Sequence, residues 1–456
     1  MPVDNPPDAK AIADKGLAVP DETIHFDGSQ SHDDRGIIEY SWDFGDGSSA
    51  KGVTATHAYS HTRIFFVTLT VEDSAGQTDK DTISIQITVI VPDDSPQLPS
   101  RGFFMGVLPT PARGQSFDEA YNQASRYSEF VPVWGRPTPF YNLAEDLSGS
   151  WGQTFVKQLI RGNGMFPIIH LSFIGSGMTL VTPPGMENAT LSDPAWRSAY
   201  KQAAVDVVKT SHPKYISLGN EVNRWYEKYG KDGVNGFKNY VSLYEEIYDE
   251  IKKIAPETKV FCVFAREIVS ENREADLEVL HLFNPSKMDL LVFTSYPYAL
   301  GKTDPSKIPI DYYSRAAGYM PGKPFGFSEV AWASLSPLGG EKAQADFLVD
   351  ITGRLTRNQG INLYLLGWAW LHDLNDNDAV GLIKFDGTEK LGYTVWKNLS
   401  GKIMMKRCCE VVHNAVVSPP CPAEHVTTDN MTTRVFTEWI LATDPVISRI
   451  KFLPWI

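Results

Sequence analysis

The chain has 456 residues, 42% of them hydrophobic and 12% aromatic, so it can bury one large core or several smaller ones. Its formal net charge of −13 argues against a nucleic acid partner, because phosphate binding needs basic surfaces. No window holds the roughly 18 consecutive apolar residues of a membrane span, and the opening MPVDNPPDAK lacks the basic and apolar regions of a signal peptide. We therefore expect a folded monomer whose ligand is neutral or weakly charged.

The negative charge is concentrated near the N-terminus. Residues 1–100 contain 17 acidic and 6 basic residues, which leaves a net charge of only −2 for the remaining residues. This change in composition coincides with the proline-rich VPDDSPQLPS, residues 91–100, which is typical of an extended linker. We expect one domain over residues 1–92, a linker over 93–100, a second domain over 101–402 and an extension over 403–456.

The first domain alternates short apolar or β-branched runs with turn clusters. The runs are TIHFDGS, IIEYSWDFGDGSS, IFFVTLTVEDSAG and DTISIQITVIV. Their period-two patterning predicts a small all-β sandwich.

A resemblance appears in the segment WDFGDG, residues 42–47, which is followed by HAYS at 57–60 and by VTLTVEDSAG. Residues 12–91 resemble a PKD domain, an immunoglobulin-like module common in secreted and surface enzymes. Asp43 and Asp46 are better explained as turn residues that accept local backbone N–H groups than as metal ligands. The resemblance implies a spacer, adhesion or weak binding module, and a secreted or cell-surface location for the chain.

After the linker the pattern changes to strands alternating with helices. Eight apolar runs predict strands: FFMGVL, FVPVW, MFPIIHLSF, KYISLGN, KVFCVF, MDLLVFTSY, KPFGFSE and NLYLLGWAW. Helical periodicity separates many of them, as in AWRSAYKQAAVDVVK and FKNYVSLYEEIYDEIKKI. This alternation predicts an α/β fold, a (β/α)8 TIM barrel. A doubly wound open sheet is less favoured, because the glycines of GFFMGVLPTPARG have the wrong spacing for a phosphate loop.

Two glutamates lie at the ends of predicted strands. Glu221 in ISLGNEVN ends the fourth strand, and Glu329 in KPFGFSEVAW ends the seventh. In this fold the carboxyl ends of the strands form one face, so the two carboxylates should meet there. Glycoside hydrolysis needs such a pair of carboxylates. One group protonates the leaving oxygen, and the other either attacks the anomeric carbon or activates water.

Residues 101 to about 400 resemble clan A glycoside hydrolases, the retaining (β/α)8-barrel enzymes. The resemblance implies that Glu221 is the general acid/base, Glu329 the nucleophile and Asn220 a ligand of the sugar 2-hydroxyl. Tyr296, in FTSYPY, matches the tyrosine that orients the nucleophile.

Aromatic and basic residues complete the expected cleft. Trp370 or Trp368, in GWAWLHDL, matches the aromatic platform under the sugar, with Trp370 preferred because it lies nearer the strand end. His170 and Arg136 are further candidates, although a buried histidine is as often a core residue. Rings in the predicted loops favour an elongated polysaccharide cleft, and about half of them are expected only to pack the loops together: Trp134, Phe140, Tyr141, Trp225, Tyr226, Tyr298 and Trp332. Glu267 and Arg266 are interpreted as a salt-bridged pair at the rim.

The resemblance implies an endo-acting retaining glycosidase that cleaves a β-linked polysaccharide by double displacement. β-1,4-Glucan is the first expectation for the substrate, followed by mannan or galactan, and no metal or organic cofactor is expected. Two alternatives stay open. A non-catalytic carbohydrate-binding or adhesion protein would keep the barrel without turnover, and a transglycosylase would use the same glutamates with a sugar acceptor.

Cysteine is sparse before the extension, where Cys262 is best explained as a small core residue. Residues 403–456 contain further cysteines and histidines at irregular spacing, which is a weak signal for zinc: Cys408, Cys409, Cys421, His413 and His425. No function is assigned to this extension.

Overall fold

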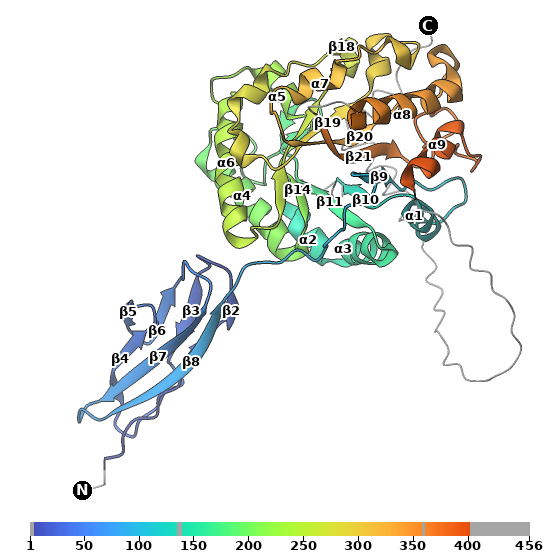
Figure 1. Cartoon of the computed structure of the whole chain (residues 1–456). Helices are drawn as coiled ribbons and strands as arrows, with labels where there is room; N and C mark the ends of the chain where they lie inside the picture. The colour runs from blue at the N-terminus through green and yellow to red at the C-terminus, as the bar shows by residue number, and fades with distance from the viewer. Residues whose placement is uncertain (1–3, 135–138, 358–360, 402–456) are drawn as a thin grey trace, which may run out of the picture. The chain divides into compact units, whose positions relative to one another are not determined.

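The computed structural model describes residues 4–134, 139–357 and 361–401 (Figure 1). Its residues fall into two compact units, one formed by Met1–Pro92 with Glu250–Glu257 and one by the described part of Asp93–Asp249 and Thr258–Ile456. Arg136 and the cysteines and histidines of the C-terminal extension lie outside the described residues.

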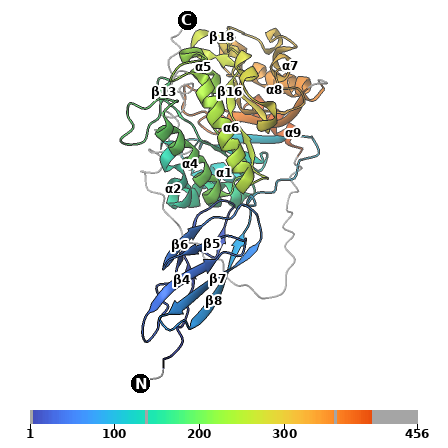
Figure 2. The ribbon, with the colours of Figure 1, turned by 90° about the vertical axis from the view of Figure 1, so that its left-hand side faces the viewer.

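The N-terminal unit is a β-sandwich, as predicted. A three-stranded sheet has the order β1-β3-β6, and a five-stranded sheet has the order β2-β8-β7-β4-β5 (Figure 2). The strands are β1 (Ile12–Ala13), β2 (Leu17–Ala18), β3 (Ile24–Asp27), β4 (Ile37–Asp43), β5 (Ser49–Lys51), β6 (Thr54–His57), β7 (Ile64–Asp73) and β8 (Thr78–Ile87). Side chains from both sheets, including Phe26 of β3 and Trp42 of β4, share one hydrophobic core.

The aspartates of WDFGDG have the predicted turn role. Asp43 Oδ1 accepts the backbone N–H of Gly45 at 2.9 Å, and Asp46 Oδ1 accepts that of Ser48 at 2.9 Å. Asp46 Oδ2 also contacts Nε2 of His57 at 2.8 Å, which ties this turn to β6. The motif is therefore explained by folding.

The second unit is a ring of parallel strands in the order β15-β14-β11-β10-β9-β21-β20-β19-β16. The strands are β9 (Phe104–Leu108), β10 (Phe130–Val133), β11 (Phe166–His170), β14 (Tyr215–Ser217), β15 (Lys259–Phe261), β16 (Val263–Ala265), β19 (Leu291–Ser295), β20 (Pro324–Val330) and β21 (Asn362–Trp370). β15 and β16 are one run interrupted only at the buried Cys262, so the ring closes with eight strands. The (β/α)8 barrel predicted from the sequence is confirmed.

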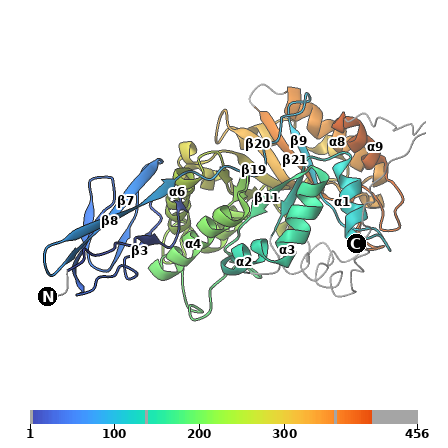
Figure 3. The same ribbon diagram turned by 90° about the horizontal axis from the view of Figure 1, so that it is seen from below.

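Helices lie outside the ring of strands (Figure 1, Figure 3). They are α1 (Phe117–Ser125), α2 (Leu143–Ser148), α3 (Ser150–Gly152), the π-helix Gln153–Ile160, α4 (Pro194–Ser211), α5 (Val222–Tyr229), α6 (Phe237–Ile254), α7 (Tyr312–Ala317), α8 (Gly340–Arg357) and α9 (Leu391–Ser400). The crossover after β16 differs from the rest. It contains two short strands that pair with each other antiparallel, β17 (Glu267–Ile268) and β18 (Arg273–Glu274), and 3-10 turns in place of an α-helix. No helix in the described ranges is long and apolar enough to cross a membrane.

Polar side chains cap the helices of the outer layer and join neighbouring ones. Asp193 caps α4 by accepting the N–H of Ala195 at 2.9 Å. Arg197 of α4 donates to Glu246 of α6 at 2.7 Å, which holds the two helices side by side (Figure 2).

Gly106 lies where two strands of the barrel approach each other closely. Gly106 of β9 pairs with Phe130 of β10, and a Cβ added at Gly106 would lie 2.2 Å from the Phe130 ring. The phenylalanine ring therefore occupies the space that any larger residue at position 106 would need.

Candidate active site

The two glutamates predicted as catalytic end their strands in buried positions. Glu221 follows β14 and precedes α5, and its exposed fraction is 5%. Glu329 lies near the end of β20 and is 2% exposed. Carboxylates are rarely buried unless hydrogen-bonded, so their partners define the site.

The end of β19, with the residue that follows it, supplies a partner to each carboxylate. Thr294 Oγ1 donates to Oε1 of Glu221 at 2.7 Å, and the hydroxyl of Tyr296 donates to Oε2 of Glu329 at 2.6 Å. Thr294 is also the register partner of Glu329 across the β19–β20 pair. Since residues two apart along a strand face the same side, Thr294 and Tyr296 bring both glutamates to one place at the end of β19.

Glu221 is held in an unusual backbone conformation. Its φ of 49° and ψ of 41° lie in the left-handed region, which disfavours residues with a Cβ. One helical turn later, Arg224 Nη1 donates to Oε2 of Glu221 at 2.5 Å. The carboxylate is therefore fixed at both oxygens, by Thr294 on one side and Arg224 on the other.

Polar groups that could meet a sugar lie at the ends of the second, third and fourth strands. His170 ends β11, is 3% exposed and stacks on Trp134, with 3.8 Å between the ring centroids. Burial lowers the pKa of His170 to about 3, so its ring is neutral at ordinary pH. Among the described residues no partner is found for either nitrogen of His170, for Nε1 of Trp134 or for Oδ1 of Asn220. These atoms are positioned to exchange hydrogen bonds with hydroxyl groups.

The three tryptophans predicted near the substrate are all buried. Trp332 and Trp368 are 0% exposed, and both rings lie near Phe347 of α8, at centroid distances of 5.5 and 6.3 Å. Their indoles donate to backbone carbonyls, so they support the strand ends from the helix layer. Trp370 instead donates to Oδ2 of Asp378 at 2.8 Å. A shift in the β21–β9 register between Trp368 and Trp370 breaks the regular alternation there.

The interpretation of Glu267 and Arg266 as a rim pair is wrong. Arg266 is 1% exposed, and its guanidinium pairs with Glu274 at 2.8 Å and lies over the Tyr312 ring. Glu267 is 4% exposed and accepts hydrogen bonds from Ser295, from Tyr312 and from the backbone of Tyr296. Successive residues at a strand end face opposite ways, so adjacency in the sequence did not imply contact between the side chains.

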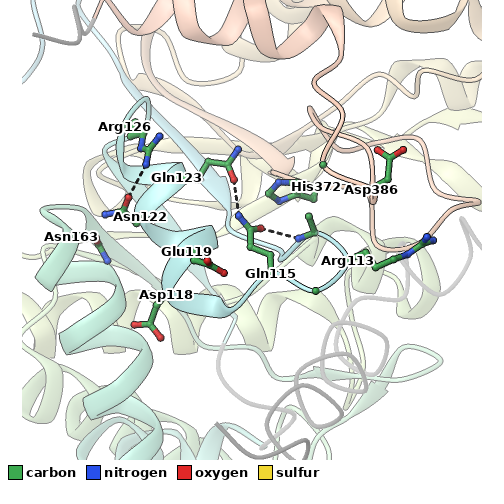
Figure 4. Close-up of a pocket in the computed structure, with 13 residues that line it drawn as sticks. Arg113, Gln115, Asp118, Glu119, Asn122, Gln123, Arg126, Asn163, His372 and Asp386 are labelled. Atoms are coloured by element: carbon green, nitrogen blue, oxygen red, sulfur yellow. Dashed lines mark hydrogen bonds between the residues drawn. The ribbon is translucent and has the colours of Figure 1, made fainter. Parts of the chain in front are cut away.

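A separate surface pocket of about 780 Å³ lies between α1 and the loop after β21. Polar side chains line it, among them Gln115, Gln123, Arg126, His372 and Asp386 (Figure 4). Two of its internal contacts are Gln115 to Gln123 at 2.9 Å and Arg126 to Asn122 at 3.2 Å. None of the residues predicted for the catalytic site lines this pocket.

Thr294 and Arg224 are site residues that the sequence analysis missed. Thr294 could have been found from strand parity, because it lies two residues before Tyr296 at the end of an apolar run. Arg224 could have been found from its spacing, since it follows Glu221 by three residues at the start of a helix.

In the described part of the chain, no group of three or more His, Cys, Asp or Glu is placed to hold a metal ion.

Comparison with known proteins identifies the first unit. Residues 4–89 match the PKD domain family, so the N-terminal unit is a PKD domain and the resemblance of WDFGDG to that module is confirmed. A stretch of 86 residues is 38% identical to the collagenase ColA of Clostridium perfringens and covers 19% of this chain and 8% of that protein. The chain spans less than a tenth of the length of the curated relatives it matches.

Solved structures similar to the chain include three barrel proteins. A family 39 glycoside hydrolase from Bacteroides cellulosilyticus WH2 is 13% identical with a TM-score of 0.47, over 86% of this chain and 82% of that one. A GH5_18 protein from Bifidobacterium longum subsp. infantis is 14% identical with a TM-score of 0.49, over 66% and 79%. The exo-β-1,4-mannosidase Op5Man5 from Opitutaceae bacterium strain TAV5 is 16% identical with a TM-score of 0.47, over 67% and 62%. At these levels of similarity the likeness by itself assigns no activity to this chain.

Proposed function

We propose that the barrel is a retaining glycoside hydrolase acting on a β-linked polysaccharide, with Glu329 as nucleophile and Glu221 as general acid/base. One observation carries the proposal: two buried glutamates from strands far apart in the sequence are each hydrogen-bonded by the same strand end, through Thr294 and Tyr296. Glutamates are seldom buried unless they are hydrogen-bonded, and the carboxyl ends of barrel strands are where the active sites of this fold occur.

The reaction would run in two displacements. In the first, Glu329 attacks the anomeric carbon while the bond to the leaving oxygen breaks, and Glu221 gives its proton to that oxygen. In the second, Glu221 takes a proton from water as the water oxygen attacks the anomeric carbon, and the ester to Glu329 breaks to restore the carboxylate. Each step has a proton donor or acceptor within the pair, so kcat/KM should follow a bell-shaped pH profile.

The neighbouring residues have assignable supporting roles. Tyr296 holds Glu329 in one orientation for attack on the sugar. Asn220 would bind the 2-hydroxyl next to the reacting carbon, and neutral His170 would bind another hydroxyl of the same ring. Trp370 is the proposed platform under the sugar, and the hydrogen bond from its indole N–H to Asp378 orients it. Arg136 is kept as a further proposed substrate-binding residue.

The family resemblance favours endo-action on β-1,4-glucan, with mannan or galactan next. The presence of a PKD domain in the same chain as the barrel supports an extracellular location. These finer points of substrate and location are proposals that a substrate panel and a localisation experiment decide.

The first experiment measures release of reducing ends from β-glucan, mannan, galactan and xylan by the wild type and by Glu329→Ala. We expect one polymer to be cleaved by the wild type and the rate to fall by at least about 10³-fold in the variant. The matched control is Glu278→Gln, an exposed glutamate of the crossover after β16, which should cleave at the wild-type rate. Undiminished activity in Glu329→Ala would exclude it as nucleophile.

Azide distinguishes the two glutamates from one another. In Glu221→Ala the covalent intermediate still forms from an activated aryl glycoside, and azide should capture it to give a glycosyl azide with the configuration of the substrate. In Glu329→Ala azide takes the place of the nucleophile and should give the opposite configuration. The same configuration from both variants would contradict the assigned roles.

The alternatives give different outcomes in these experiments. A binding protein would be retained on one polymer and release no reducing ends from any of them. A transglycosylase would convert the same donor mainly into longer oligosaccharides when the acceptor concentration is high, and Glu329→Ala would lose that activity as well.

A further inference from the structure

We propose that Glu267 is a positioning residue for the nucleophile, acting through the backbone and orientation of Tyr296. This inference rests on the proposed glycosidase function, and it adds a carboxylate that is hydrogen-bonded to Ser295, Tyr296 and Tyr312. The order of contacts is Glu267 to Tyr296, then Tyr296 to Glu329.

The contacts of Glu267 converge on the segment that carries Tyr296. Oε2 of Glu267 accepts the backbone N–H of Tyr296 at 2.7 Å. Oε1 accepts the hydroxyl of Ser295 at 2.9 Å and that of Tyr312 at 2.6 Å. Charge-assisted hydrogen bonds of this kind are about twice as strong as neutral ones, so one carboxylate fixes two successive residues at the end of β19.

The strand register explains why this carboxylate is in reach. Ala265 of β16 is the register partner of Thr294 of β19, so two residues further along Glu267 comes beside Tyr296. The hydroxyl of Tyr296 then lies 2.6 Å from Oε2 of Glu329. An orientation error at the Tyr296 backbone would be carried to the nucleophile, where a displacement of about 1 Å can lower a rate by about 10²-fold.

The surroundings of Glu267 are titratable but mostly uncharged. Burial raises the pKa of Glu267 to about 7, and the nearby positive charge of Arg266 opposes this increase. The hydroxyl of Tyr312 donates to Glu267, and the charge of Glu267 also acts on Tyr298 and Tyr313. Burial raises the pKa of all three tyrosines, so they stay neutral. Glu267 is therefore the group in this cluster that changes charge near neutral pH.

A double-mutant cycle on the cleaved polymer tests the route through Tyr296. We expect Glu267→Gln to lower kcat by about 10-fold with little change in KM, and Tyr296→Phe to lower it by about 10²-fold. If Glu267 acts through Tyr296, the double variant should be no slower than Tyr296→Phe alone. Effects that multiply would overturn the proposal, since they would show that the two residues act independently.

Two further variants separate positioning from general destabilisation. Glu274→Gln removes the nearby carboxylate that pairs with Arg266, and it should keep the wild-type kcat. Glu267→Ala removes all three hydrogen bonds and, if it retains a wild-type circular dichroism spectrum, should lose more kcat than Glu267→Gln. Wild-type kcat in a folded Glu267→Ala would also overturn the proposal.

A readout independent of activity uses protein labelled with ¹⁵N-tyrosine, in which the Tyr296 amide is assigned by its loss in Tyr296→Phe. We expect this amide resonance to shift with a midpoint near pH 7 in the wild type and in Glu274→Gln, and not in Glu267→Gln. An unshifted resonance in the wild type, or the same titration in Glu267→Gln, would show that the contact does not operate. If no polymer is cleaved, the proposed function fails while this measurement still decides the contact.

Discussion

The side-chain hydroxyl of Thr294 is hydrogen-bonded to Glu221, which makes its contribution to the chemistry separable from that of Tyr296. Thr294 donates to Glu221, whereas Tyr296 donates to Glu329. Protonation of the leaving oxygen matters most when that oxygen is a poor leaving group, and attack by the nucleophile matters for every substrate. The two side chains should therefore differ in how their loss depends on the substrate.

We expect Thr294→Val, which keeps the shape and removes the hydroxyl, to slow polysaccharide cleavage by about 10-fold. The same variant should cleave a dinitrophenyl glycoside, which needs no protonation of its leaving group, at close to the wild-type rate. Tyr296→Phe should slow both substrates. Steady-state kinetics on the two substrates measure this, and an equal loss on both in Thr294→Val would place its role elsewhere.

Glu267 also predicts how stability depends on pH. Because its pKa is raised to about 7, the folded chain holds a proton that the unfolded chain releases between about pH 4.5 and 7. The free energy of unfolding should therefore fall as pH rises through this window, by at most about 1.4 kcal/mol per pH unit from this group. Denaturant unfolding of Glu267→Gln should give a flatter profile. Asp373, whose pKa burial raises to about 7, keeps a similar contribution in both proteins, and an unchanged slope would contradict the prediction.

Strands and helices were the features most accessible to prediction from the sequence. Each of the eight apolar runs became a strand of the barrel, because apolar residues on both faces of a strand are the direct signature of a buried parallel sheet. Crossovers with strong helical periodicity, such as α4 and α6, were also evident. The crossover after β16 was not, because its 3-10 turns and short hairpin leave no periodic pattern.

The site was predicted only as far as strand order determines it. Glu221, Glu329 and Tyr296 could be placed because each ends a numbered strand. The hydrogen bonds of Glu267 and the burial of Trp332 depend on side-chain direction at irregular strand ends. Register shifts such as the one between Phe293 and Thr294 are set by three-dimensional packing, so they cannot be predicted from one sequence.

The packing of β9 against β10 predicts how adding one methyl group at Gly106 changes the stability of the barrel. Gly106→Ala would place a Cβ about where the Phe130 ring lies, so one of the two must move. Overpacking of this kind typically destabilises by about 1–3 kcal/mol. Chemical unfolding monitored by tryptophan fluorescence measures the loss. The control is Gly162→Ala, because this exposed glycine of the barrel unit has no positive φ and its added Cβ would make only an ordinary contact, 3.6 Å from the Lys157 carbonyl oxygen. The double variant Gly106→Ala/Phe130→Leu should recover part of it, and no recovery would contradict the steric explanation.

At the scale of the whole molecule, the PKD domain has a hydrophobic core whose members all come from that domain and include none of the buried residues of the barrel. Trp42, which is 1% exposed, belongs to the core of the PKD domain, and the proposed catalytic residues all lie in the barrel unit. A defect in the core of the PKD domain should therefore leave the barrel able to function.

Trp42→Ala tests this independence. The change should destabilise the PKD domain by about 3–5 kcal/mol and so shift its unfolding to lower temperature in a calorimetric scan. The rate of polymer cleavage by the full chain at 25 °C should stay within about twofold of the wild type. A large loss of cleavage would mean that the barrel depends on the PKD domain for its fold or its substrate.

The left-handed backbone at Glu221 has a consequence for how this chain could change over many generations. Glycine or asparagine adopts a φ of 49° more readily than glutamate, by about 1 kcal/mol, so the backbone alone favours residues that cannot supply the carboxylate. If the carboxylate has the role proposed above, a lineage that lost the reaction would be free to replace Glu221, and a lineage that kept the reaction would have to keep the strained residue.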